Sequence, residues 1–272
     1  MKQTALIEHI AGGLRDDKAL AGLFLGGSFG RGTEDSYSDI DFIALVEPDA
    51  QTATITRWRE CLQSITPIVF WRQRGQGNVL VNAITADWLR CDLSVMTPAS
   101  FTGRARNTVR PLIDRDDRYG SLPETLPVKA PDTGKVEFLI GEFLRVLGLL
   151  NVVVGRREYV TAVGGAGMLR DHLVSLMLEA ANVAGRGGAL HLSKALPEDD
   201  MQTLLRLPCP KPERQAVIDA NFSIAEQFLP RARALAKQLE LPWPDDFEQA
   251  TLQMLARSLG PTPDWNALSS AS

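Results

Sequence analysis

Two aspartates stand two positions apart at the start of a strand-like run, and this spacing constrains the chain more than any other feature. The run Asp39–Val46 is rich in β-branched and aromatic residues, which is typical of a strand. Successive side chains of a strand point to opposite faces, so Asp39 and Asp41 share one face. Carboxylates this close repel each other, and a hard divalent cation bound through oxygen is the usual compensation. The other face is apolar and can enter a core through Ile40, Phe42, Ala44 and Val46.

A glycine-serine turn precedes this strand. The apolar run Gly22–Gly27 predicts a short buried strand that stops at glycine, and a polar loop begins at Ser28. The backbone N–H groups of such a turn, together with the Ser28 hydroxyl, form a cradle for phosphate oxygens, particularly where a helix begins. A phosphate cradle beside paired carboxylates indicates phosphoryl or nucleotidyl transfer, in which positioning and charge neutralisation supply most of the catalysis.

The rest of the chain divides into a mixed half and a helical half. An amphipathic helix is expected over Lys2–Leu20, and further strands over Ile65–Trp71, Asn78–Ile84 and Leu89–Val95. Prolines, glycine and charges cluster over Asp114–Lys135, which predicts a linker. Apolar residues then recur every three or four positions over 137–154, 158–185, 212–240 and 245–259, which predicts helices. The fold class is therefore α+β: an N-terminal α/β domain with a mixed sheet (1–125), followed by a C-terminal all-helical domain (126–272).

Composition narrows the compartment and the partners. The net charge of −4 and the pI near 5.5 argue against a long nucleic-acid substrate, whose phosphates need a basic field. Three scattered cysteines fit neither a zinc site nor a disulfide framework, which favours a reducing cytoplasm. The N-terminus lacks the apolar core of a signal peptide, and no stretch is expected to reach transmembrane length, so no membrane partner is expected.

The stretch GGSFGRGTEDSYSDIDFIALV resembles the signature of the polymerase-β-like nucleotidyltransferase superfamily. The likeness includes Gly-Ser, the following Arg-Gly, the serine before the first aspartate, and the spacing to Asp-x-Asp. It implies an enzyme that uses Mg²⁺ and a nucleoside triphosphate, with ATP the expected co-substrate. Asp39 and Asp41 would be catalytic metal ligands, and Gly27, Ser28 and Arg31 would bind the nucleotide.

The resemblance also implies a third carboxylate on a neighbouring strand, and Asp92 is the expected residue. In the run Leu89–Val95, alternation places Leu89, Cys91, Leu93 and Val95 toward the core and Asp92 on the polar face. Asp92 would serve as the general base or as a ligand of a second metal. Two alternatives stay open: Asp92 pairs with Arg90 as an ordinary surface ion pair, or Asp87 takes its place.

The order of the two domains resembles that of antibiotic nucleotidyltransferases, especially the two-domain lincosamide enzymes. The run Phe138–Gly164 resembles the first part of their helical domain. The implied acceptor is a hydroxyl of a small molecule, a lincosamide or an aminoglycoside. Lincosamide enzymes carry glutamate at the position of Asp41, whereas aminoglycoside relatives carry aspartate, so the drug class stays open. The resemblance also leaves a homodimer open. The rival functions are a protein AMP-transferase of the toxin–antitoxin type and a non-catalytic nucleotide-binding homologue.

Several residues of the helical half have two interpretations. Arg156 and Arg157 either reach the triphosphate or complement a helix end. Glu142 and Arg145 either line a cleft or pair with each other. Glycines 164, 165 and 167 favour close helix packing over phosphate binding. Arg186 and His191 match the Arg-x4-His signature of HEPN ribonucleases, although the glycines between them argue against a helix.

Overall fold

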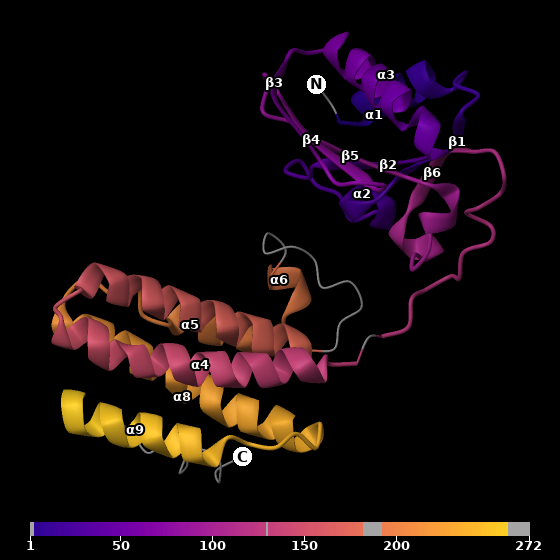
Figure 1. Cartoon of the computed structure of the whole chain (residues 1–272). Helices are drawn as coiled ribbons and strands as arrows, with labels where there is room; N and C mark the ends of the chain where they lie inside the picture. Colours follow the sequence, from indigo (N-terminus) through magenta and orange to yellow (C-terminus); the bar gives the residue numbers. More distant parts are fainter. Residues whose placement is uncertain (1–2, 129, 182–191, 261–272) are drawn as a thin grey trace. The chain divides into compact units, whose positions relative to one another are not determined.

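The computed structural model describes residues 3–128, 130–181 and 192–260, and the chain divides into two compact units, 1–127 and 128–272 (Figure 1). This division lies two residues beyond the boundary expected from the sequence. The N-terminal unit is built around a sheet and the C-terminal unit is helical, so the α+β fold class is confirmed.

The N-terminal unit contains one six-stranded mixed sheet in the order β3-β4-β5-β2-β1-β6. The strands are β1 (Leu20–Leu25), β2 (Ile40–Val46), β3 (Ile68–Arg74), β4 (Val79–Thr85), β5 (Arg90–Met96) and β6 (Arg110–Asp114). Neighbouring strands run antiparallel except β2 and β5, which pair in parallel. A parallel pair needs a crossover, and here α3 (Gln51–Gln63) and the β3–β4 hairpin supply it.

The two faces of the sheet have different coverings. Helices α1 (Gln3–Leu14) and α3 lie on one face (Figure 1) and form the main core of this unit, in which Trp58 is fully buried. The apolar face predicted for β2, with Ile40, Phe42, Ala44 and Val46, belongs to this core. The opposite face carries a smaller cluster of Phe24, Ile43, Leu45, Met96, Phe101 and Val109, in which the rings of Phe24 and Phe101 stack 4.7 Å apart. Asp41 of β2 lies on this second face, in alternation with Phe42.

Two expectations for the N-terminal unit need correction. The first helix ends at Leu14 rather than at Leu20, because Leu20 already begins β1. The segment before the linker contains an additional strand, β6, which pairs with β1 at the edge of the sheet. Pro111 and the exposed start of β6 hide it from a search for strand patterns, since proline is depleted in strands and is tolerated at an edge.

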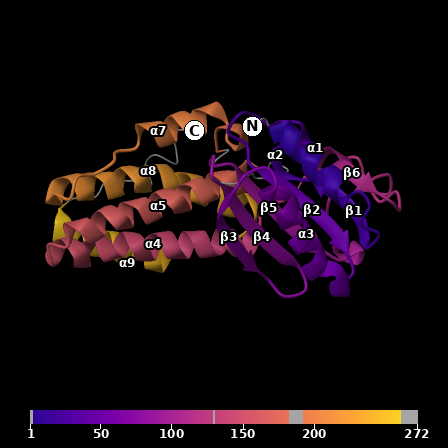
Figure 2. The ribbon, with the colours of Figure 1, turned by 90° about the horizontal axis from the view of Figure 1, so that it is seen from above.

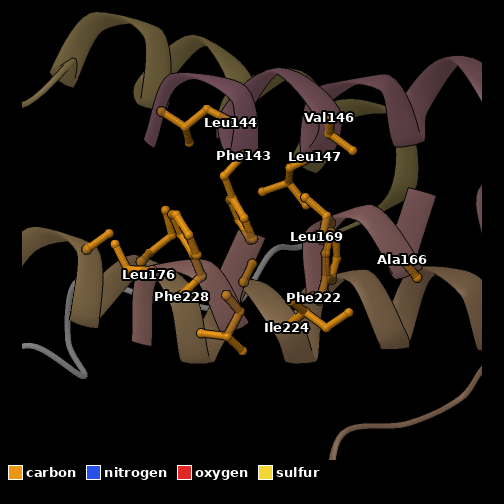
Figure 3. Close-up of a cluster of buried hydrophobic side chains, with 14 of the residues drawn as sticks. Phe143, Leu144, Val146, Leu147, Ala166, Leu169, Leu176, Phe222, Ile224 and Phe228 are labelled. Atoms are coloured by element: carbon orange, nitrogen blue, oxygen red, sulfur yellow. The ribbon is translucent and has the colours of Figure 1, made fainter. Parts of the chain in front are cut away.

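The C-terminal unit packs long helices side by side (Figure 2). Helix α4 (Thr133–Gly155) contacts α5 (Tyr159–Ala180), α8 (Arg214–Gln238) and α9 (Asp245–Leu259), and α5 also contacts α8. The short helices α6 (Leu192–Ala195) and α7 (Glu198–Arg206) were not expected. Figure 3 shows the centre of the core, where Phe143 of α4 points toward Phe228 of α8. Their rings stack with centroids 3.7 Å apart.

Helix α4 corrects the expectation about transmembrane length. It has 23 residues, an 18-residue window of it has a mean hydropathy of 1.8, and the helix is long and apolar enough, by length and composition alone, to cross a membrane. A core helix of a globular unit passes the same test. Nine residues of α4 are buried in the helical unit, among them Phe143 and Leu147.

Candidate active site

Asp41 and Asp92 face each other across the parallel pair of strands. In the register of β2 and β5, Ile40 lies beside Cys91, Asp41 beside Asp92 and Phe42 beside Leu93. Side chains in register on neighbouring strands point to the same face, so both carboxylates lie on the face opposite the main core. Both are half-buried. The structure thus brings together two of the three predicted carboxylates.

The third carboxylate, Asp39, lies immediately before β2 and is also half-buried. Its Oδ2 atom is 3.3 Å from Nη1 of Arg90, and the two form an ion pair. Because Ile40 lies beside Cys91, the register places Arg90 next to Asp39. Arg90 therefore pairs with Asp39, and the alternative in which Asp92 merely pairs with Arg90 does not describe this structure.

Asn82 is a site residue that the sequence analysis missed. It lies on β4 in register with Asp92, and its Nδ2 atom donates a hydrogen bond of 2.7 Å to Oδ2 of Asp92. One Asp92 oxygen is thereby held while the other keeps its lone pairs for a second partner. The signal was present in the run Asn78–Ile84, where Asn82 is polar between apolar neighbours, but its partner follows only from the pairing of β4 with β5.

The glycine-serine turn lies directly against Asp41. The N–H of Gly26 donates to the backbone oxygen of Asp41 at 2.8 Å. Gly27 has φ of 56°, and a Cβ at this position would overlap Oδ2 of Asp41, so only glycine fits. The short helix α2 (Gly27–Arg31) begins here, and the Ser28 side chain in its first turn is 4% exposed. Within the described residues, the buried Oγ of Ser28 has no hydrogen-bond partner.

The electrostatics of the site reflect an excess of negative charge. Burial raises the pKa of Asp41 to about 6; the Asp39 and Asp92 carboxylates add to the rise, while Arg31 and Arg90 oppose it. Burial also raises the pKa of Asp92, against the hydrogen bond from Asn82. Arg31 is exposed at the end of α2 and is near enough to act on Asp41. The chain alone therefore compensates the negative charge of the three carboxylates only in part.

Asp87, the alternative to Asp92, has a local role instead. It lies in the turn between β4 and β5, where Oγ1 of Thr85 donates to its Oδ1 at 2.6 Å. This hydrogen bond is the main reason that the pKa of Asp87 is lowered. Asp87 belongs to the turn and not to the row of carboxylates on β2 and β5.

The residues of this face fit a hard divalent cation by their chemistry. The donors are carboxylate oxygens, Arg31 and Arg90 offset their mutual repulsion only in part, and the adjoining turn carries the Ser28 hydroxyl, which has no partner among the described residues. In the part of the chain that the structure describes, no group of three or more His, Cys, Asp or Glu side chains is already arranged to hold a metal ion. The Asp39 carboxylate is turned toward Arg90, with which it forms an ion pair. A cation held by all three aspartates therefore requires Asp39 to exchange partners.

The structure also bears on the alternatives in the helical unit. Nε of Arg145 donates to Oε2 of Glu142 at 2.7 Å, so these two residues pair with each other. Arg156 and Arg157 lie at the end of α4, where Arg157 takes a φ of 60°. Among the described residues, a Cβ added to Gly164, Gly165 or Gly167 would meet nothing within 4 Å, so close packing between these residues does not explain the glycines. The Arg186–His191 motif lies outside the described residues.

Comparison with known proteins identifies the N-terminal unit. Residues 7–111 match the family model of the nucleotidyltransferase domain. This range includes β1, α2, β2, β4 and β5. It therefore contains the residues of the carboxylate face, which are Asp39, Asp41, Asn82, Arg90 and Asp92. The N-terminal unit thus belongs to the nucleotidyltransferase domain family. The chain is a nucleotidyltransferase, as the sequence predicted.

Solved structures give more distant matches. An aminoglycoside 6-adenyltransferase from Bacillus subtilis matches with 14% identity and a TM-score of 0.45, over 93% of this chain and 97% of that one. The Cid1 poly(U) polymerase, in a structure with Mg and 3′-dATP bound, matches with 20% identity and a TM-score of 0.27, over 35% of this chain and 30% of that one. A search of curated proteins gives no match. The sequence identities and TM-scores of these two structures are low, so the assignment to the nucleotidyltransferase domain rests on the family model alone.

Proposed function

We propose that this enzyme transfers a nucleoside monophosphate, AMP from ATP, to a hydroxyl of a small molecule in a Mg²⁺-dependent reaction. The observation that carries the proposal is the register of Asp41 with Asp92 beside the Gly27–Ser28 turn. Two carboxylates against a glycine-serine turn, whose serine hydroxyl has no partner among the described residues, are an arrangement suited to nucleotidyl transfer. The proposed acceptors are antibiotics of the lincosamide or aminoglycoside class, and the proposed compartment is the cytoplasm.

Each residue has a role in this reaction. Mg²⁺, when bound, offsets the negative charge of the triphosphate and of the departing pyrophosphate. Asp39 and Asp41 would hold the ion, with Asp39 released from Arg90. Ser28 Oγ would donate to a phosphate oxygen, and Arg31 would add positive charge beside it.

Asp92 would take the proton from the acceptor hydroxyl, or hold a second metal ion. The acceptor oxygen then bonds to the α-phosphorus as the bond from that phosphorus to the pyrophosphate oxygen breaks. Asn82 would keep Asp92 in place, because it holds one oxygen and leaves the other directed to the acceptor. The helical unit would supply contacts to the acceptor.

The test is a transfer assay with the full chain. The enzyme is incubated with Mg²⁺, each of the four nucleoside triphosphates in turn, and a panel of lincosamides and aminoglycosides, and products are read by mass spectrometry. An acceptor that gains the mass of a nucleoside monophosphate, with release of pyrophosphate, is the expected result. Asp41→Asn should give no product. Asp87→Asn, which removes a carboxylate from the turn between β4 and β5, should transfer like wild type. Transfer to a protein in place of any small molecule would contradict the proposed acceptor class.

A further inference from the structure

The helical unit contains a cavity that the proposed chemistry does not use. It has a volume of about 460 Å³ and lies between α4, α5 and α8. Small-molecule sites in proteins have volumes of about 300–1,000 Å³, so the cavity is of ligand size. Its walls are mainly apolar, with Val146, Leu150 and Val153 from α4 and Met168 from α5. Val146 is seen at the edge of the core in Figure 3.

Two glycines form part of the α5 wall. Gly164 and Gly165 line the cavity, and a Cβ at either position would meet nothing within 4 Å. Glycine in a helix interior costs about 1 kcal/mol relative to alanine, and here the packing of the unit does not require it. The absent side chains are what keeps this wall open. Glycine at these positions is thus accounted for if something outside the described chain occupies the space.

A buried polar side chain lies in the same wall. Asn221 of α8 is 2% exposed and lines the cavity. Its Nδ2 atom donates to the backbone oxygen of Val217 at 2.7 Å, which fixes the orientation of the amide. Within the described residues its Oδ1 accepts no hydrogen bond. This oxygen therefore keeps its acceptor capacity for a donor on a bound molecule.

The charge of the lining selects against cations. Arg145 is the charged residue among those that line the cavity, and its guanidinium is held by Glu142. A positively charged guest would lose hydration against apolar walls and find no carboxylate that is free of Arg145. A neutral guest meets no such cost.

We propose that this cavity is a binding site for a small, neutral, amphipathic molecule. Its apolar body packs on Val146, Leu150 and Met168, and one O–H or N–H group donates to Oδ1 of Asn221. The site belongs to the helical unit and does not depend on the carboxylate face, so it stands or falls separately from the proposed transfer reaction.

The test uses indole as the probe, because it is flat, apolar and carries a single N–H donor. Titration of the full chain by calorimetry should detect binding of indole. Binding of 1-methylindole should be about five- to tenfold weaker, since the hydrogen bond to Asn221 is lost. Tryptamine, which carries a positive charge, should be weaker still.

Variants locate the binding. Gly165→Leu should abolish indole binding because its side chain fills the cavity. Gly167→Leu is the matched control: it lies on the same helix with equally open space but does not line the cavity, so it should bind like wild type. In Asn221→Leu, indole and 1-methylindole should bind with equal affinity. If that variant does not fold, the comparison of the two probes on the wild-type chain still decides the question.

Three results would overturn the proposal. The first is no heat of binding with indole, and the second is binding that Gly165→Leu leaves intact. The third comes from sedimentation: if the wild-type chain is a dimer that Gly165→Leu dissociates and Gly167→Leu does not, a second copy of the chain occupies the cavity.

Discussion

The Cβ that Gly27 lacks would occupy the place of the Asp41 carboxylate oxygen. Turn and carboxylate are therefore fitted to each other, and we expect Gly27→Ala to displace Asp41 and to lower transfer by at least about a hundredfold. The matched control is Gly32→Ala. Gly32 also has a positive φ, 66°, but a Cβ there would meet no atom of the described residues within 4 Å. The Gly32→Ala substitution therefore incurs only the backbone cost of about 1–2 kcal/mol. Steady-state rates and melting temperatures of the two variants separate backbone strain from the clash. Equal activity in both would show that the clash has no consequence for the site.

Removing the charge of Asp41 should stabilise the metal-free protein. The pKa of Asp41 is raised from 3.8 to about 6, so folding favours the protonated form. The stability that this preference gives is fully present below pH 3.8 and is lost as the pH rises through about 6. The difference corresponds to at most about 3 kcal/mol, and solvent screening of a half-buried group reduces it to about 1–2 kcal/mol.

Urea unfolding in the presence of a chelator measures this effect. The free energy of unfolding of Asp41→Asn should exceed that of wild type by about 1–2 kcal/mol at pH 7.5, and the two values should converge near pH 4. In the control, Asp87→Asn, the free energy of unfolding should fall below that of wild type, because the pKa of Asp87 is lowered and its charge favours the fold. An Asp41→Asn protein that is less stable than wild type at pH 7.5 contradicts the electrostatic account.

Asp92→Ala should change the rate of transfer far more than the binding of ATP. Loss of a general base costs on the order of a hundredfold to ten-thousandfold in kcat, and loss of a metal ion as well would cost more. Asn82→Leu should lower kcat by less, because Asp92 stays present but loses the donor that orients it. Single-turnover rates and ATP binding measured with each variant decide this. An Asp92→Ala enzyme within a few-fold of wild-type kcat removes the residue from the site.

Mg²⁺ and ATP together should raise the melting temperature by more than the sum of their separate effects. We expect the chain alone to hold the ion weakly, since Asp39 is paired with Arg90 and no preassembled cluster exists within the described residues. In the proposed reaction phosphate oxygens would complete the coordination, so each ligand would strengthen the binding of the other. A thermal titration at subsaturating concentrations measures the coupling, with Ca²⁺ in place of Mg²⁺ for comparison. Strictly additive shifts would count against a shared site.

The shared face of the three aspartates could be predicted from the alternation of side chains along each strand. The two-residue period of a strand placed Asp39 and Asp41 on one face and sent Phe42 to the core, and the same rule oriented Asp92. The four long helices follow equally from local pattern. These are properties of single segments, and a single segment can be interpreted without knowing its neighbours.

The parts that could not be predicted depend on pairing between segments. Arg90 lies beside Asp39 because Ile40 pairs with Cys91, and no local pattern fixes that register. Asn82 likewise acquires its partner through the antiparallel pairing of β4 with β5. The glycines of α5 were misinterpreted because their open surroundings depend on the packing of three helices.

The parallel pairing of β2 with β5 also determines when the site can form during folding. The partners Asp41 and Asp92 are separated by α3 and by the whole β3–β4 hairpin, which can form from local contacts. Closing this loop is entropically costly, so the carboxylates meet late, after their surroundings are largely in place. Their repulsion therefore acts on the completed fold and not on its nucleus. Relief of that repulsion, by a ligand or by a neutral side chain, is expected to slow unfolding and to leave the folding rate nearly unchanged.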